Sequence, residues 1–310
     1  MPDYTLSEYV DYWMATFKIN RVEESTIDRL ITSINTMREY PIANMPIKDI
    51  TTLEIMDYMN ELVDHGYALT TIKKLVRVAT APLKQAAALH HIPADPSIGI
   101  RFPKEEHVLK PKKEAIPYTP QEQERLWAVL NTNQRWGYRT IGFMLETGTR
   151  IGEALALEWS DIDFKRKSVR IRKTVTRLAN KKQSKVKKGA KTHSSNRLIP
   201  LTPKAIEILE ELHSTSPNEW VFSDGNGDRL SYEAVRYQTQ CACKAAGIQY
   251  RGEHVFRHTY TTNCYKKNTN IKILSKALGH SSVSITQDIY VHLYGDGFDE
   301  MYAELVKDAQ

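Results

Sequence analysis

Apolar residues return every three or four positions through the first hundred residues, a spacing that predicts α-helices. Within 51–63, Thr51 and Glu54 have the spacing of a capping box, which marks the start of a helix. Ser25 and Thr26 are candidate N-caps of an earlier helix. The predicted helices cover residues 6–17, 25–37, 51–63 and 70 to beyond 88.

The periodic pattern stops at residues 103–118, which hold three prolines, many charges and little periodicity. Such a composition is typical of a linker. Helices resume at Thr119-Pro-Gln-Glu122, a start signature with proline at the first helical position. A buried, apolar helix is then expected to run up to Gly148.

Apolar and basic residues alternate between residues 167 and 177, which predicts one strand with a face in solvent. Residues 196–201 are its predicted partner, and the rest of the chain has the pattern of helices. We therefore predict a mainly α protein with a small antiparallel β-sheet in its C-terminal domain. The predicted organisation is an all-α domain over 1–102, a linker over 103–118 and an α+β domain over 119–310.

The net charge of +6 on 310 residues is distributed unevenly. Residues 1–100 hold 9 Lys/Arg and 13 Asp/Glu, whereas residues 101–310 hold 34 and 24. Residues 165–197 hold 14 Lys/Arg and no acid, a density that favours contact with a polyanion such as nucleic acid. The alternative is a solvated hairpin tip, an interpretation that suits Lys181 and Lys182.

Several protein classes are disfavoured by the sequence. Cys241, Cys243 and Cys264 form no even disulfide framework and lack the second pair of a zinc site. The N-terminus has no secretory pattern, and no stretch is apolar enough to span a bilayer. We expect a cytoplasmic protein with no membrane partner. The chain also lacks the G-x-x-x-x-G-K phosphate loop of many ATP-using enzymes.

The C-terminal part contains residue types suited to phosphodiester cleavage. A phosphate in transfer gathers negative charge on its oxygens, and two guanidinium groups can neutralise that charge with directed hydrogen bonds. A phenol can then attack without a metal. The motifs with these groups are Thr147-Gly-Thr-Arg150, His254-Val-Phe-Arg257-His258, Leu278-Gly-His280 and Asp288-Ile-Tyr290.

Simpler interpretations exist for several of these residues. Arg150 and Glu153 could form an ordinary surface ion pair. His254 and His258 have the spacing of a zincin helix, although Val255 stands where that motif needs glutamate. We interpret His258 as a core histidine.

Two further ambiguities concern the acidic residues and the tyrosines. Asp161-x-Asp163 lies at a predicted helix-to-strand junction, and we interpret it as turn residues rather than a metal site. Because the chain has 16 tyrosines, Tyr265 and Tyr294 are rivals of Tyr290 as the nucleophile. A phenol has an ordinary pKa of about 10, so its attack needs a proton acceptor and cations nearby.

In order and spacing, the motifs resemble those of the tyrosine recombinase (phage integrase) family. The shared pattern is arginine in T-G-x-R-x-x-E, a lysine on a β-hairpin, H-x-x-R on a helix, L-G-H-S and a terminal tyrosine. The resemblance covers the C-terminal two-thirds, and it implies that the N-terminal helices form a SAM-like core-binding domain. The implied catalytic residues are Arg150, Lys191, His254, Arg257, His280 and Tyr290, with Glu153 in support.

The resemblance implies that Lys191 protonates the leaving 5′ oxygen, with Lys187 and Lys188 close enough to be alternatives. It also implies that the fourth helix clamps one side of a duplex, whereas a solvated helix face is the other interpretation. The implied DNA contacts are Lys73, Lys74, Arg77, Arg172, Lys185, Lys187, Lys188 and Arg197.

The implied reaction is a two-stage strand transfer on double-stranded DNA. Tyr290 attacks the scissile phosphate, forms a 3′-phosphotyrosyl link and frees a 5′ hydroxyl, which then attacks the link on a partner strand. No metal, ATP or other cofactor is implied.

The resemblance also implies partners. Such recombinases act as homo-tetramers that exchange C-terminal segments. Residues 298–306 are the candidate tail, and packing of this tail on its own domain is the alternative. Accessory DNA-bending or directionality proteins and a bacterial or phage origin belong to the same expectation.

Four other functions compete with this interpretation. A topoisomerase or a resolvase would use the same tyrosine chemistry, the former as a monomer. A DNA-binding regulator would need the basic hairpin but not the site residues, and a zinc hydrolase built on His254 and His258 would lose activity with a chelator. Because the helices begin by Leu6, we expect the arm-binding domain of many mobile-element integrases to be missing or left out, which leaves directional control by arm sites open.

Overall fold

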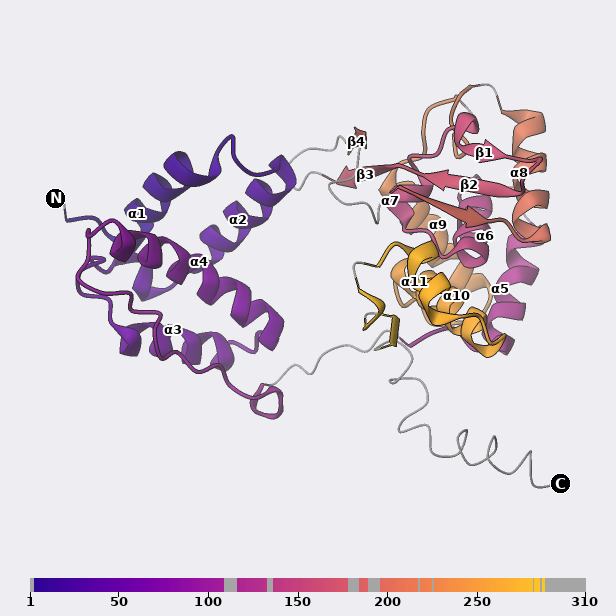
Figure 1. The fold of residues 1–310 in the computed structure, drawn as a ribbon. Coiled ribbons are helices and arrows are strands. Elements are labelled where there is room, and N and C mark those ends of the chain that lie inside the picture. The colour runs from indigo at the N-terminus through magenta and orange to yellow at the C-terminus, as the bar shows by residue number, and fades with distance from the viewer. Residues whose placement is uncertain are drawn as a thin grey trace. The chain divides into compact units, whose positions relative to one another are not determined.

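The computed structural model divides the chain into two compact units, each with its own apolar core (Figure 1). Of residues 177 and 184–188 only the backbone is described. The described residues are 3–108 in the first unit and 116–132, 136–177, 184–188, 196–216, 218–224, 226–280, 282–284 and 286–287 in the second.

The first unit is built from helices joined by turns and irregular segments, as the apolar spacing predicts. All four predicted helices are present, and the first passes into a short π-helix. The elements are α1 (Leu6–Trp13), the π-helix Met14–Lys18, α2 (Glu24–Met37), a 3-10 turn (Pro41–Asn44), α3 (Thr52–Asp64), α4 (Leu69–Ala88) and a 3-10 turn (Glu105–His107).

One predicted helix start is confirmed and another is wrong. The backbone N–H of Thr51 donates to Glu54 Oε2 at 2.8 Å, which forms the expected capping box of α3. Helix α2, however, has Glu23 as its N-cap. The N–H of Thr26 donates to the Glu23 carbonyl at 2.8 Å, so Ser25 and Thr26 already lie inside the first turn.

The core of the first unit joins α1, α2, α3 and α4. Large side chains from these helices are fully buried, and their burial removes apolar surface from water, the main favourable contribution to folding. They include Leu6 and Tyr9 from α1, Ile55 and Leu62 from α3, and Ile72 and Leu83 from α4.

The second unit packs helices around the buried helix α6, which α8, α9 and α10 contact. In the described parts of the chain, no helix is both long and apolar enough to cross a membrane. The elements are α5 (Pro120–Thr132), α6 (Trp136–Thr147), α7 (Ile151–Ala154), a 3-10 turn (Trp159–Asp161), β1 (Ile162–Asp163), β2 (Ser168–Ile171), β3 (Lys173–Arg177), β4 (Ser184–Lys188), β5 (Arg197–Pro200), α8 (Pro203–Thr215), α9 (Tyr232–Ala245), α10 (His254–Lys266) and α11 (Ile271–Leu278).

The single strand predicted over 167–177 is wrong, because the structure divides it at Arg172. Strand β2 lies between β1 and β5 in one antiparallel sheet, whereas β3 pairs with β4 in another. The predicted pairing with 196–201 is confirmed, with Val169 opposite Ile199. Inward-facing Ile171 and Val175 keep the same alternation across the break, so the sequence pattern does not mark the change of partner.

Candidate active site

A tight turn after α6 places Arg150 at the start of α7. Gly148 has φ of +63°, and a Cβ there would lie 2.5 Å from Tyr260 Cδ1, so both the conformation and the space favour glycine. Arg150 is the N-cap of α7, as the glycine signal predicts. Its side chain remains partly exposed, which leaves it accessible to an anion at the helix start.

Glu153 is a buried carboxylate behind Arg150, in the orienting position that the sequence predicts. Its oxygens accept hydrogen bonds from the Arg150 backbone N–H and Nη1, each at 2.9 Å. Burial alone would raise the pKa of this carboxyl, but hydrogen bonds and charge from Arg197, with the charge and backbone N–H of Arg150, lower it to about 2. Glu153 therefore stays ionised at neutral pH.

Arg197 is the second partner of Glu153, and this role differs from the predicted DNA contact. Its side chain is 4% exposed, and Nη1 and Nη2 donate to the two Glu153 oxygens at 3.0 and 2.8 Å. Its Nε donates to the Ala277 carbonyl at 2.6 Å. The available sequence signal is the strand alternation, which places Arg197 on the inward side with Ile199 while Leu198 faces out.

Arg257 projects from α10 into the same cluster. Its Nη1 donates to the Gly148 carbonyl at 3.0 Å and its Nη2 to the Leu278 carbonyl at 2.7 Å. Burial first, and then the charge of Arg150, lower the pKa of Arg257 to about 9, so the guanidinium keeps its proton at neutral pH. Together with Arg197, it satisfies two backbone carbonyls at the C-terminal end of α11.

His280 follows α11 in a fixed position. Gly279 ends the helix with φ of +68°, and the His280 N–H donates to the Ser275 carbonyl at 3.1 Å. Its Nδ1 lies 2.8 Å from Thr286 Oγ1. Burial, followed by the charges of Arg257, Arg150 and Arg197, lowers the pKa of His280 to about 4, so its imidazole is neutral at pH 7.

His254 and His258 lie one turn apart on α10. Burial lowers the pKa of His254, as do the charges of Arg150 and Arg257, although part of its surface is exposed. Burial also lowers the pKa of His258, with smaller effects from His254 and Arg257. Within the described residues, no group of three His, Cys, Asp or Glu side chains could hold a metal ion.

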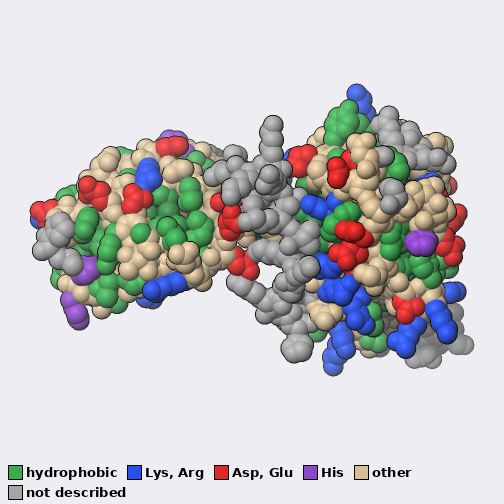
Figure 2. Space-filling model, turned by 90° about the horizontal axis from the view of Figure 1, so that it is seen from above, with side chains coloured by type: hydrophobic (Ala, Val, Ile, Leu, Met, Phe, Trp, Pro, Cys, Tyr) green, Lys and Arg blue, Asp and Glu red, His purple; other side chains and the backbone are tan. Residues whose placement is uncertain are grey.

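A groove of about 830 Å³ borders this cluster between β5 and α11. Arg197 and His280 belong to its lining, together with the exposed cations Arg170, Lys272 and Lys276. Figure 2 shows Lys and Arg side chains gathered on part of the visible face of the second unit. A cationic groove beside two buried arginines suits a phosphodiester backbone.

Of the other predicted DNA contacts, Arg172 is already in an ion pair. Its Nε lies 2.5 Å from Oδ1 of the buried Asp161, which Lys173 also contacts, so Asp161 is part of an ion-pair cluster. Lys185, Lys187 and Lys188 lie on β4, of which only the backbone is described.

On the first unit, Lys73, Lys74 and Arg77 are exposed along α4, where the sequence places them. Lys73 Nζ lies 5.8 Å from the centroid of the exposed Phe102 ring. Lys73, Arg77 and Phe102 line a groove of about 390 Å³, which leaves them accessible to a ligand.

The remaining predicted site residues, Lys191 and Tyr290, lie outside the described residues, as do the rival Tyr294 and the tail 298–306. The other rival, Tyr265, lies on α10. The structure therefore brings Arg150, Glu153, His254, Arg257 and His280 together with Arg197, and the nucleophile stays a prediction.

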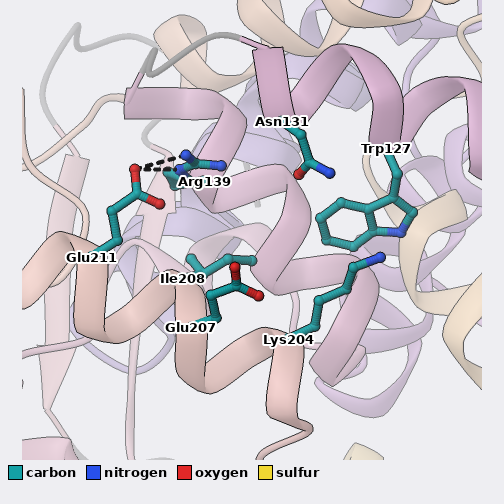
Figure 3. A pocket seen from close by; sticks show the side chains of 7 residues that line it. All are labelled: Trp127, Asn131, Arg139, Lys204, Glu207, Ile208 and Glu211. Atoms are coloured by element: carbon teal, nitrogen blue, oxygen red, sulfur yellow. Dashed lines mark hydrogen bonds and ion pairs between the residues drawn. The ribbon is translucent and has the colours of Figure 1, made fainter.

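A separate pocket of about 300 Å³ lies between α5, α6 and α8 (Figure 3). Its polar groups contact one another: Arg139 donates to Glu211 Oε1 at 2.7 and 3.1 Å, and Lys204 Nζ lies 3.9 Å from the Trp127 ring centroid. None of the sequence-predicted site residues lines it. The predicted chemistry thus belongs to the arginine cluster and not to this pocket.

Comparisons with known proteins agree with the motif resemblance. The model of the phage integrase family matches residues 118–296, and the model of the phage integrase N-terminal SAM-like domain matches residues 5–63. The chain is 25% identical to a tyrosine recombinase XerC-like protein of Caldanaerobacter subterraneus subsp. tengcongensis, over 94% of this chain and 80% of that protein. It is 24% identical to the integrase of Staphylococcus phage L54a, over 93% of this chain and 87% of that one.

Solved structures show the same fold. The Tn1549 transposon integrase, in complex with a circular intermediate DNA, matches with a TM-score of 0.82 at 18% identity, over 98% of this chain and 99% of that chain. The lambda integrase, as a tetramer bound to a Holliday junction, matches with a TM-score of 0.68 at 20% identity, over 93% and 78%. The predicted fold class, an all-α SAM-like domain with an α+β catalytic domain, is confirmed. The chain belongs to the phage integrase family of tyrosine recombinases.

Proposed function

We propose that this tyrosine recombinase cleaves and rejoins DNA at specific sites through a 3′-phosphotyrosyl intermediate, in the integration or excision of a mobile element. The observation that supports this most directly is the cluster of Arg150, Arg257 and His280, which is held by buried and partly buried hydrogen bonds beside a cationic groove. Preorganised cations of this kind stabilise charge that develops on a phosphate during transfer.

The two arginines would bind the non-bridging oxygens of the scissile phosphate. Arg150 is partly exposed at a helix start, and Glu153 fixes its guanidinium from behind. Arg257 uses Nη1 and Nη2 for two backbone carbonyls, and a guanidinium has five N–H donors in all. Its other donors can bind a phosphate oxygen without disturbing the contacts that orient it.

The two histidines would complete the phosphate site, His254 from α10 and His280 from the residues that follow α11. His254 lies one turn before Arg257 on α10, so both side chains lie on one face of the helix. His280 is neutral at pH 7 and can exchange hydrogen bonds with a phosphate oxygen or with the phenol.

Tyr290 is the proposed nucleophile and Lys191 the proposed general acid. The phenol gives its proton to a neutral histidine of the cluster, its oxygen forms a bond to phosphorus, and the bond from phosphorus to the 5′ oxygen breaks. The leaving oxygen takes a proton from the lysine. The phosphodiester bond energy is kept in the tyrosyl ester, so rejoining needs no nucleotide cofactor.

A suicide substrate with a nick near the cleavage position tests this function. We expect the wild type to accumulate a covalent protein–DNA adduct, and Tyr290→Phe to bind DNA with unchanged affinity but form none. Tyr265→Phe is the matched control and should form adducts at the wild-type rate. Adducts formed by Tyr290→Phe would rule out Tyr290 as the nucleophile. Relaxation of supercoiled DNA that has no recombination sites would favour a topoisomerase.

The proposal extends to partners and location. The lambda integrase neighbour is a tetramer on a Holliday junction, which supports a homo-tetramer with exchanged C-terminal segments for this chain as well. Relatives from bacteria and phages support action on DNA in the bacterial cytoplasm, where accessory DNA-bending or directionality proteins could take part. Lys73, Lys74 and Arg77 are the proposed duplex contacts of the first unit.

A further inference from the structure

Thr286 is the one hydroxyl that contacts His280 among the described residues. Its Oγ1 lies 2.8 Å from Nδ1, and its side chain is 2% exposed. The His280 backbone is held independently, through the left-handed Gly279 and the bond to Ser275. The contact with Thr286 therefore acts on the imidazole ring itself, where it limits rotation and occupies one nitrogen.

The hydroxyl of Thr286 differs from those of most other buried threonines in this unit. Thr239, Thr259 and Thr262 each donate to the carbonyl four residues earlier, at 2.8 to 2.9 Å. Within the described residues, Thr286 has no such backbone acceptor, and Nδ1 is the acceptor available to its O–H. A buried O–H that lacks an acceptor is unfavourable, so donation from Oγ1 to Nδ1 is the preferred arrangement.

The direction of the hydrogen bond between Thr286 and Nδ1 decides which tautomer His280 adopts. A neutral imidazole has one N–H, and the partner of one nitrogen determines whether the other is a donor or an acceptor. If Nδ1 accepts from Thr286, Nε2 bears the hydrogen. Nε2 is then a hydrogen-bond donor, the form that a phosphate oxygen beside Arg150 and Arg257 requires.

We propose that Thr286 is a positioning residue that donates its hydroxyl to Nδ1 of His280 and so keeps Nε2 protonated as a donor to the scissile phosphate. This inference rests on the proposed function. The inference goes beyond the proposed function in two ways. It places the imidazole hydrogen of His280 on Nε2, and it names Thr286 as the residue that keeps the hydrogen on that atom.

The tautomer is measured first, on the full wild-type chain without DNA. In the ¹⁵N spectrum of histidine-labelled protein at neutral pH, with His280 assigned through His280→Asn, we expect the hydrogen on Nε2. A hydrogen on Nδ1 would overturn the proposal, whether or not the protein proves to be a recombinase. This readout separates failure of the inference from failure of the proposed function.

Cleavage of the suicide substrate at saturating DNA provides the second test. Thr286→Val keeps the shape of the side chain and removes the hydroxyl, so we expect cleavage to slow about 10- to 100-fold while the Kd for DNA changes less than about twofold. Thr286→Ser restores the hydroxyl and should recover most of the rate. Thr239→Val, which removes a buried hydroxyl of α9, should cleave at the wild-type rate. Equal rates for Thr286→Val and wild type, or an equal loss with Thr286→Ser, would contradict the proposal.

Discussion

Glu153 shows how a single buried carboxylate can order two arginines. It accepts three side-chain hydrogen bonds, one from Arg150 and two from Arg197, and it is almost fully buried. A buried charge is tolerated only when its partners compensate the lost hydration. The orientation of Arg150 therefore depends on Arg197, a residue 44 positions from Glu153 in the sequence.

Removal of Arg197 should destabilise the second unit and misalign Arg150. We expect Arg197→Met to lower the free energy of unfolding by about 3–5 kcal/mol, because Glu153 is left buried with one partner fewer. Arg139→Met is the control, since its partner Glu211 is more exposed, and it should cost about 1 kcal/mol or less. Denaturant unfolding measures both, and equal losses would contradict the special role of Arg197.

The same variant should change the acid sensitivity of the fold. Glu153 has a folded pKa of about 2, below its ordinary 4.5, so its stabilisation is present above pH 4.5 and is lost as the pH falls towards 2. In Arg197→Met the pKa of Glu153 should rise towards 4.5 or beyond. The part of the free energy of unfolding that is lost between pH 4.5 and 2 should therefore shrink.

At the residue scale, sequence reasoning found the chemistry but not all of the contacts. Motif spacing led to Arg150, Glu153, Arg257 and His280, which the structure brings into one cluster. It assigned Arg197 to DNA because the segment is basic, although the strand alternation places this residue on the inward side with Ile199. A carboxylate partner that lies on a distant element can be recognised only once the strand and the helix are packed.

At the level of elements, most local signals were reliable, although Ser25 and Thr26 do not cap α2 as predicted. The capping box of Thr51 begins α3, and α6 ends before Gly148, as predicted. The division of 167–177 at Arg172 depends on which strand pairs with which. The alternation of apolar and polar residues specifies which face of a strand is buried and not which strand is its partner. The change of partner at Arg172 could therefore not be predicted from the sequence.

The contact between α7 and β3 is tight enough to test. A Cβ on Gly152 would lie 2.5 Å from the Val175 carbonyl oxygen, a backbone atom that cannot rotate away. We expect Gly152→Ala to cost about 1–3 kcal/mol of stability and to slow cleavage, since α7 must shift and Arg150 moves with it. Thermal unfolding and suicide-substrate cleavage measure the two effects.

Gly142→Ala is the matched control on α6. Its Cβ would lie 3.0 Å from the ends of the Ile208 and Trp127 side chains, which can move. We expect a smaller loss of stability and a wild-type cleavage rate at permissive temperature. If Gly142→Ala slows cleavage as much as Gly152→Ala, the effect comes from general destabilisation rather than from α7.

For the whole molecule, the uneven charge distribution should govern DNA affinity. Neutralised phosphates release counterions, so the logarithm of the association constant should fall with the logarithm of salt concentration by about 0.9 for each phosphate contact. Removal of Lys73, Lys74 and Arg77 together should flatten this dependence by up to about 2.7 if each binds one phosphate. Fluorescence anisotropy over a salt series measures the slope.

Lys48→Ala serves as the control for this experiment. Its Nζ pairs with Asp3 at 2.9 Å on the surface of the same unit, and it is not among the predicted contacts. The slope should stay as in the wild type. An unchanged slope in the triple variant would favour the solvated-face interpretation of α4.

The C-terminal end of α11 holds several residues of the candidate site in place. Its carbonyls at Ala277 and Leu278 receive Arg197 and Arg257, and His280 follows two residues later. A molecule in which this helix end is displaced would lose the alignment of three side chains in one step. Competence for strand cutting would then be all-or-none, and such a molecule would stay inert instead of leaving slow, unrepaired nicks in DNA.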